Sequence, residues 1–158
     1  MIKELHIYDI DGVLVDSSHR YRYIIGADGW RAIDLPYWIA NRKHAKRDRL
    51  LPLAKQYQAQ NSDPSIFTVL ATARVMTPAE WRHVETVLTM PDHFISRTEG
   101  NTESGAALKT KGLNILFEAI PDLLTVPGYF YEDNITYLNN VCETFNFSPL
   151  YITSKQGY

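Results

Sequence analysis

The chain has 158 residues, a length that favours one domain with a substantial core. Its composition, 45% hydrophobic and 22% charged, is ordinary for a globular protein, and no apolar run approaches the ~20 residues of a membrane span. The net charge of −2 excludes a general attraction for nucleic acid, and the single cysteine, Cys142, excludes a disulfide framework or a cysteine-rich zinc site. With an N-terminus that lacks the apolar stretch of a signal peptide, these features predict a cytoplasmic location, in the host if the source is viral.

Strand and helix patterns alternate along the chain. The expected elements, in chain order, are strands at 4–10 and 66–71, a helix from a capping box at Thr77-Pro78-Ala79-Glu80 to about Thr89, a short strand at 93–96, a helix over 105–119, a strand at 129–131, a helix over 135–145 and a last strand at 150–152. This alternation predicts an α/β fold, a three-layer Rossmann-like parallel sheet with helices on both faces.

The stretch between the first two expected strands is longer than a crossover connection needs. It contains several aromatic residues and a helical pattern around 50–57. We therefore expect one domain over 1–158, with a small helical cap inserted after the first strand, at about 17–65. Within the cap, residues 42–49 carry five basic side chains and one acid. This basic stretch is either a solvated helix face or a contact for phosphate groups, and the sequence leaves both open.

Two acids, Asp9 and Asp11, follow the first strand at alternate positions. Residues i and i+2 of a strand point the same way, so the two carboxylates repel unless a cation lies between them. A hard cation with oxygen ligands, most simply Mg²⁺, would relieve that repulsion, and Gly12 then lets the chain turn sharply. The alternative is an ordinary Asp-Gly turn in solvent.

Two further positions carry groups that suit an anion. Thr72 follows the strand at 66–71, where its hydroxyl and free backbone N–H groups suit a phosphate oxygen. Lys109 lies on the apolar stripe of its helix, whereas Lys111 projects to the opposite side. Because Lys109 is also near the helix N-terminus, where the dipole disfavours a cation, it indicates a bound anion. A lysine that snorkels from a helix end is the alternative.

A last acidic pair, Glu132-Asp133, ends the strand at 129–131. A third carboxylate at the same sheet edge would complete a Mg²⁺ site. The alternative is N-capping of the following helix by Asp133 or Asn134, and both roles can coexist in neighbouring residues.

In this order, Asp9-Ile10-Asp11-Gly12-Val13-Leu14, Thr72, Lys109 and Glu132-Asp133 resemble the four motifs of the haloacid dehalogenase superfamily of phosphohydrolases. Within it, the chain is most similar to phage and bacterial phosphatases related to the phosphatase domain of polynucleotide kinase. That closer likeness is carried by Ser18-His19-Arg20 after the first motif, by Trp38 and Asp48 in the cap, and by Arg97 with Gly100-Asn101 before the lysine. The sequence departs from the usual pattern at Val13, Ala73, Glu132 and Asn134, without the loss of a catalytic group.

The resemblance implies a Mg²⁺-dependent phosphomonoesterase in which Asp9 attacks phosphorus and Asp11 protonates the leaving oxygen. The implied catalytic residues are Asp9, Asp11, Thr72 and Lys109. The implied metal ligands are Asp9, Asp11 through its backbone carbonyl, and Asp133, with Glu132 behind them. The implied substrate contacts are Thr72, Ala73, Arg74, Lys109, His19, Arg20 and Arg97.

The resemblance and the basic stretch together favour a nucleotide or a nucleic-acid terminal phosphate as substrate. A deoxyribonucleotidase, a small-metabolite phosphatase and a phosphotransferase of the same superfamily stay open. A receiver domain of a response regulator would need an aspartate where the 66–71 strand ends in Thr72, and a non-catalytic binding protein would not need the complete set of acids and the lysine. No membrane partner is expected, and the sequence does not fix an oligomeric state.

Overall fold

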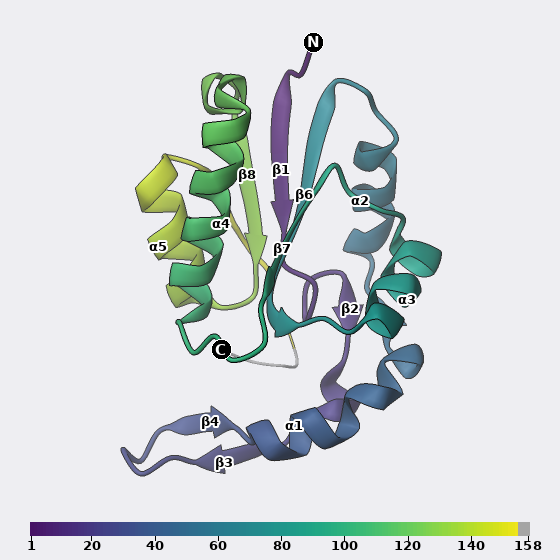
Figure 1. Cartoon of the computed structure of the whole chain (residues 1–158), viewed down its shortest axis with the longest axis vertical. Helices are drawn as coiled ribbons and strands as arrows, with labels where there is room; N and C mark the ends of the chain where they lie inside the picture. Colours follow the sequence, from purple (N-terminus) through teal and green to yellow (C-terminus); the bar gives the residue numbers. More distant parts are fainter. Residues whose placement is uncertain (155–158) are drawn as a thin grey trace.

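A five-stranded parallel sheet forms the middle of the computed structural model, which describes residues 1–154 (Figure 1). In spatial order its strands are β7 (His93–Arg97), β6 (Ile66–Val75), β1 (Glu4–Tyr8), β8 (Gly128–Glu132) and β9 (Ser148–Tyr151). The chain builds outward from β1 to β7 and then returns to β8 on the other side of β1. The sheet therefore has its topological switch point between β1 and β8, where open α/β sheets form a ligand crevice.

Helices cover both faces of this sheet (Figure 1). The helices α2 (Leu53–Asn61) and α3 (Pro78–Leu88) lie on one face, and α4 (Gly105–Ala119) and α5 (Ile135–Phe145) lie on the other. Alternate residues of β1 supply the two cores: Ile7 packs with the α4 and α5 side chains, and Tyr8 packs with those of α2 and α3. The predicted three-layer fold is confirmed.

The helix boundaries follow the capping signals in the sequence. Thr77 and Glu80 form the expected capping box at the start of α3. At the start of α5 the capping side chain is Asn134, whose Oδ1 accepts hydrogen bonds from the N–H groups of Thr136 and Tyr137. Capping by Asn134 leaves the Asp133 carboxylate available for another role.

The ends of the first two sheet strands, β1 and β6, differ from the expected ones, and both differences concern the polar residues. The first strand stops at Tyr8, because the chain turns between Ile10 and Val15. The second strand runs on to Val75, and its pairing with β7 is irregular between Ala71 and Val75. Thr72 therefore lies inside β6 at an irregularity rather than beyond the strand end. Such irregularities are a common means of re-aiming side chains beside active sites.

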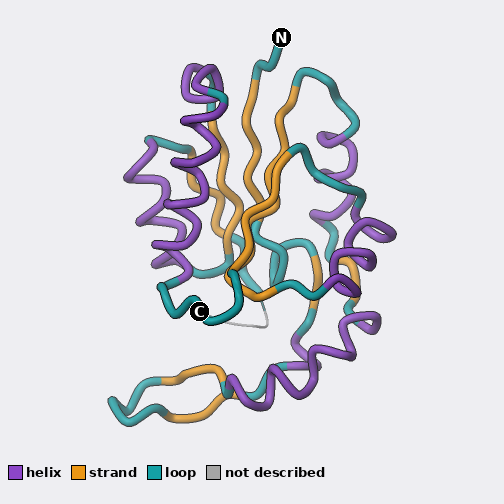
Figure 2. Tube along the Cα trace, viewed as in Figure 1, coloured by secondary structure: helices purple, strands orange, loops and turns teal. Residues whose placement is uncertain are grey.

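The insertion between β1 and β6 contains more strand than the sequence pattern indicated. Its elements are β2 (Val15–Asp16), η1 (Ser18–Arg20), β3 (Tyr23–Ile25), β4 (Arg31–Ile33), α1 (Leu35–Asn41), η2 (Arg42–Arg47) and β5 (Arg49–Leu50). The antiparallel hairpin of β3 and β4, which the sequence analysis missed, extends away from the sheet (Figure 2).

The expected cap range, 17–65, includes α2, but α2 belongs to the sheet layer. Its residues Ala54 and Tyr57 are buried in the same core as Tyr8. The cap itself is the segment between β2 and β5, which pair with each other at the base of the cap. This pairing places the cap at the carboxyl ends of the sheet strands (Figure 1). Within residues 1–154, no helix is long and apolar enough to span a membrane.

Candidate active site

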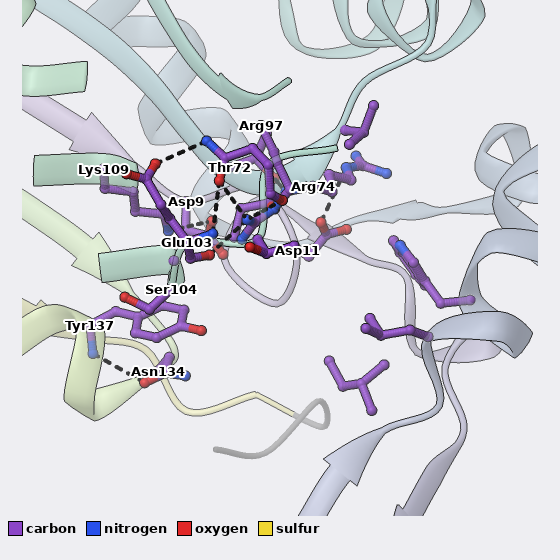
Figure 3. A pocket seen from close by; sticks show the side chains of 18 of the residues that line it. Asp9, Asp11, Thr72, Arg74, Arg97, Glu103, Ser104, Lys109, Asn134 and Tyr137 are labelled. Carbon is purple, nitrogen blue, oxygen red and sulfur yellow. Dashed lines mark hydrogen bonds and ion pairs between the residues drawn. The ribbon is translucent and has the colours of Figure 1, made fainter. Parts of the chain in front are cut away.

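A cavity of about 680 Å³ lies between the carboxyl ends of the strands and the cap (Figure 3). Most of the predicted site residues line it, namely Asp9, Asp11, Thr72, Ala73, Arg74, Arg97, Lys109, Glu132 and Asp133. The fold thus gathers side chains that are up to 124 positions apart in the sequence at the switch point of the sheet.

Lys109 reaches into this edge from the second turn of α4 and is 1% exposed, as its place on the apolar stripe predicted. Its ammonium group donates to Asp9 Oδ1 at 2.8 Å and to Glu132 Oε2. Burial alone would lower the pKa of Lys109, but the charges of Asp9 and Glu132 outweigh burial and raise it. Lys109 is therefore a permanent cation fixed beside Asp9, while Lys111 projects outward with a mostly exposed side chain.

Asp133 joins these residues to form what we call the lysine cluster, which comprises Asp9, Lys109, Glu132 and Asp133. Carboxylate oxygens of its three acids lie within 4.8 Å of one another. Burial, reinforced by the charge of Glu132, raises the pKa of Asp9 to about 7. Burial, reinforced by Asp9, raises that of Asp133 to about 6. Three carboxylates face one ammonium group, so two negative charges lack a counterion in the cluster, which fits a hard divalent cation.

The backbone at Gly12 is shaped around this acidic group. Gly12 has a φ of +78°, and a Cβ atom there would lie 2.1 Å from Asp133 Oδ2. Only a residue without a side chain allows that carboxylate to approach the turn after β1. Asp133 Oδ2 also accepts a hydrogen bond from Ser154 Oγ at 2.6 Å. The Asp-Gly turn is therefore one wall of the acidic site.

Glu132 uses both of its carboxylate oxygens within the protein. Oε2 accepts from Lys109, and Oε1 accepts from the backbone N–H groups of Asp133 and Asn134 at 3.1 Å each. With both oxygens engaged, Glu132 is suited to orienting Lys109 and the start of α5. These contacts favour the prediction that Glu132 supports the metal ligands and does not bind the ion itself.

Asp11 has a different set of partners from Asp9. Ser17 Oγ donates to its Oδ1 at 2.7 Å, and the Arg74 Nε atom lies 3.2 Å from its Oδ2. Arg74 also pairs with Glu80 through Nη1 at 3.3 Å. Burial would lower the pKa of Arg74, and the charges of Asp11 and Glu80 outweigh it and raise it. Asp11 is thus held by the Ser17 hydroxyl at the start of the cap and by the Arg74 guanidinium from β6.

His19 and Arg20, expected to contact substrate, do not line the cavity in this structure. Arg20 is fully buried, forms two hydrogen bonds to Asp48 through Nε and Nη2, and lies over the Trp38 ring with its Cζ 4.3 Å from the centroid. His19 Nε2 is 2.9 Å from Asp48 Oδ1. These contacts join the two arms of the cap, because Asp48 lies where the chain leaves it.

Arg97 lines the cavity, but backbone carbonyl groups occupy its guanidinium. Nε donates to the Ala73 carbonyl at 2.6 Å, and Nη1 donates to the Asn101 and Glu103 carbonyls at 3.0 and 2.7 Å. Arg97 therefore ties the loop after β7 to β6. Its contacts indicate a role in shaping the cavity wall, and its contact with substrate stays a prediction.

Sequence reasoning did not assign the cap side of the cavity. The lining residues from the cap are Tyr21, Ile33, Leu35, Trp38, Ile39 and Arg42. Arg42 is the member of the basic stretch 42–49 that lines the cavity. Of the apolar residues among them, the sequence motifs include only Trp38. The other apolar residues carry no local sequence signal and come together only through the fold of the insertion. Glu80, another lining residue, was seen in the sequence only as part of a capping box.

Solved structures with the same fold include a hydrolase from Streptococcus pneumoniae, 11% identical with a TM-score of 0.60, in a match that covers 99% of this chain and 96% of that one. The haloacid dehalogenase (HAD) domain of the Legionella pneumophila effector Lem4 is also 11% identical, with a TM-score of 0.56 and coverage of 96% and 88%. At such identities the likeness shows the fold.

A third match is 3-deoxy-D-manno-octulosonate 8-phosphate phosphatase from Moraxella catarrhalis, solved with magnesium, phosphate and KDO. It is 16% identical with a TM-score of 0.46, and the match covers 90% of this chain but 63% of the phosphatase, so this chain spans less than two thirds of that protein's length. A search of curated protein sequences gave no match.

A family model that matches the sequence, together with the fold, places the chain in the haloacid dehalogenase superfamily of phosphatases, whose members are hydrolases that act on phosphomonoesters. Phosphatases of this superfamily use Mg²⁺, and the lysine cluster fits that ion. The chain belongs to the bacteriophage T5 5′-deoxynucleotidase family, whose sequence model matches residues 1–86, just over half of its length. The matched part contains Asp9, Asp11 and Thr72, whereas Lys109 and Asp133 lie beyond it.

Proposed function

We propose that this protein is a Mg²⁺-dependent phosphomonoesterase that acts through an aspartyl-phosphate on nucleotides. The observation that carries the proposal is the lysine cluster at the sheet's switch point. There a buried aspartate is paired with a buried ammonium group and two further carboxylates, and it faces a cavity large enough for a small molecule.

In the first step, a carboxylate oxygen of Asp9 forms a bond to phosphorus as the bond from phosphorus to the leaving oxygen breaks. Asp11 gives its proton to that oxygen. In the second step, Asp11 takes a proton from water, whose oxygen attacks the phosphorus. Inorganic phosphate leaves, and the Asp9 carboxylate is restored. Each proton that Asp11 gives is therefore returned to it within one turnover.

The other residues stabilise charge during both steps. Lys109 is fixed 2.8 Å from Asp9 and offsets the charge that collects on the carboxylate and on the transferring oxygens. Thr72, 1% exposed at the irregularity of β6, offers its hydroxyl to those oxygens. Asp9, Asp133 and the Asp11 backbone carbonyl would hold Mg²⁺, which when bound supplies the positive charge that the cluster lacks.

A deoxynucleoside 5′-monophosphate is the substrate that the family membership favours. The cavity supports this choice, because its volume of about 680 Å³ lies within the range of pockets for molecules of that size. Its cap side is mostly apolar, with aromatic residues Tyr21 and Trp38 and one cation, Arg42. Such a lining suits a flat nucleobase better than a sugar phosphate rich in hydroxyl groups.

The end of a nucleic-acid strand is the second candidate, and the basic stretch favours it. Arg42 lines the cavity, and the neighbouring Lys43, Lys46, Arg47 and Arg49 are exposed. A polymer held in the cavity by its terminal phosphate could then extend along these cations.

The test is phosphate release, with and without Mg²⁺, from deoxynucleoside 5′- and 3′-monophosphates, 5′- and 3′-phosphorylated oligonucleotides and sugar phosphates. We expect Mg²⁺-dependent release, fastest from the 5′-deoxynucleotides. No release from any of these substrates would refute the enzymatic proposal.

The two substrate candidates are separated by a variant in which Arg42, Lys43, Lys46 and Arg47 are neutralised. A polymer substrate requires that the variant lose more activity on oligonucleotides than on mononucleotides, and that the difference shrink as salt rises. Equal effects on both substrates would reject a polymer-binding role for the basic stretch.

A further inference from the structure

Glu80 has two sets of partners, and the capping box accounts for only one. Its Oε2 accepts from the backbone N–H and the hydroxyl of Thr77, both at 2.8 Å, which closes the first turn of α3. Its Oε1 lies 3.3 Å from Arg74 Nη1 and 4.0 Å from Arg20 Nη1. A capping box needs one side-chain oxygen and accepts glutamine as readily as glutamate. Helix capping therefore explains neither the second oxygen nor the charge.

The charged carboxylate of Glu80 is buried, and its burial costs free energy. Glu80 is 5% exposed, and the side chains of Arg74 and Arg20 are 8% and 0% exposed. Burial of an ion pair costs several kcal/mol per ion, so it is weak evidence for a gain in stability alone. A buried charge that helix capping does not need, beside the guanidinium that touches Asp11, points to a role in the site.

Arg74 connects the two carboxylates in one geometry. Its Nε lies 3.2 Å from Asp11 Oδ2, and its Nη1 faces Glu80. Because a guanidinium is planar and rigid, fixing one edge of it also fixes the direction of the other nitrogen. We refer to Asp11, Arg74, Glu80, Arg20 and Asp48 as the arginine cluster. In it, α3 determines where Arg74 lies, and Arg74 determines where Asp11 lies.

We propose that Glu80 is a positioning residue for Asp11, acting through Arg74, and that the first turn of α3 thereby sets the placement of the group that protonates the leaving oxygen. The inference rests on the proposed function, in which Asp11 is that group. It adds a role that none of the four sequence motifs contains.

The experiment compares two leaving groups. A deoxynucleoside 5′-monophosphate releases an alkoxide, which needs a proton as the bond breaks, whereas p-nitrophenyl phosphate releases a stable phenolate, which does not. Because Asp11 also activates water in the second step, which both substrates share, the two leaving groups are compared in the first step, by the burst of leaving group before steady turnover. A misplaced Asp11 slows that burst for the nucleotide and leaves it little affected for the aryl phosphate. A general loss of fold or of metal would slow both.

Glu80→Gln is the central variant, because glutamine keeps the capping box and removes the charge that faces Arg74. We expect the burst rate of leaving-group release to fall about tenfold or more for the nucleotide and to stay within about twofold for p-nitrophenyl phosphate, with little change in KM for either. Thr77→Ala is the matched control, since it removes a capping hydroxyl and leaves the Glu80 charge in place. It should lower Tm without a change in the ratio of the two activities.

Asp11→Asn separates the two levels of the argument. If it slows the burst equally for both substrates, Asp11 is not the acid and the proposed function is wrong on that point. If the effect of Asp11→Asn on the burst is selective for the nucleotide and that of Glu80→Gln is not, the role of Glu80 is refuted. Should Glu80→Gln fail to fold, Arg74→Lys serves instead, because lysine keeps the charge and cannot hold both carboxylates. Its burst rates must show the same selectivity, and a change in KM alone would also refute the inference.

Discussion

Asp9 and Asp11 are two residues apart, yet they belong to two ionic clusters of different construction. The lysine cluster sets three acids against one ammonium group, and burial, reinforced by the neighbouring carboxylates, raises the pKa of Asp9 and Asp133. In the arginine cluster, the acids form ion pairs with two guanidinium groups, and the residues of the cluster come from several elements of the fold. The comparison teaches that the first cluster has two carboxylates in excess of its one cation and needs a cation from outside, whereas in the second cluster two guanidinium groups leave an excess of one carboxylate.

The largest expected effect comes from Asp9→Asn. An amide cannot form the aspartyl-phosphate, so turnover should fall by at least about a thousandfold. The same change removes one of three crowded carboxylates, and we therefore expect the metal-free variant to be no less stable than the wild type. Phosphate-release kinetics and thermal melts in EDTA measure the two effects. An active Asn variant would remove Asp9 from the role of nucleophile.

Lys109→Met tests what the ammonium group contributes to the fold. Without it, Asp9 and Glu132 remain buried with no cationic partner between them, and the free energy of unfolding should fall by about 3 to 5 kcal/mol. Urea denaturation in EDTA measures the loss, with Lys111→Ala as the exposed control, expected within about 0.5 kcal/mol of wild type. Arg74→Met should cost a similar amount in the arginine cluster. Mg²⁺ should restore part of the stability of Lys109→Met and none of that of Arg74→Met; equal responses to Mg²⁺ would erase the distinction between the clusters.

Addition of Mg²⁺ to the wild-type protein should raise its stability directly. At a Mg²⁺ concentration of about 100 times Kd the gain is about 2.7 kcal/mol, or roughly 5 to 10 °C in Tm for a domain of this size. Asp133→Asn, which removes a proposed ligand and keeps its size, should lose most of that response. Differential scanning fluorimetry over a Mg²⁺ series measures both curves. A wild-type Tm that ignores Mg²⁺ contradicts the assignment of the cluster as a metal site.

The smallest expected effect is that of Asn134→Ala. Asn134 adjoins the lysine cluster in sequence, but its side chain caps α5 and carries no charge. The substitution should cost about 1 kcal/mol, the usual contribution of an N-cap, and leave the Mg²⁺ response intact. Urea denaturation with and without Mg²⁺ checks this. A lost Mg²⁺ response would mean that the cluster depends on the cap of α5 as well as on charge.

The sheet and its helices were predictable because their signals are local. An apolar run with polar residues at its end, a capping box before α3 and a 3.6-residue stripe in α4 each define an element within a few residues. The position of Lys109 followed from the same stripe, since a side chain four residues before Leu113 must face the sheet. Asp9 and Lys109 could thus be placed at one edge from periodicity and the general rule for α/β sheets.

The cap and the partners of the arginines were not predictable in this way. The β3–β4 hairpin has no alternating pattern strong enough to distinguish it from a loop or a short helix. Arg20 and Arg97 have the residue type of a phosphate ligand, but the fold surrounds Arg20 with Asp48 and Trp38 and gives Arg97 the carbonyls of a loop. Arg20 meets Asp48 across 28 positions of sequence and Arg97 meets the Ala73 carbonyl across 24, and a linear pattern carries no record of such contacts.

The short antiparallel pair of β2 and β5 has a consequence for how such enzymes can change. Val15 pairs with Leu50 and Asp16 with Arg49, so the chain departs from the sheet and comes back to it at one point. Whatever lies between these residues can lengthen, shorten or be replaced while the distance across its base stays the same. The part of the cap between Arg20 and Asp48 can therefore vary in length and sequence without moving Asp9 or Lys109, which the sheet and α4 hold in place.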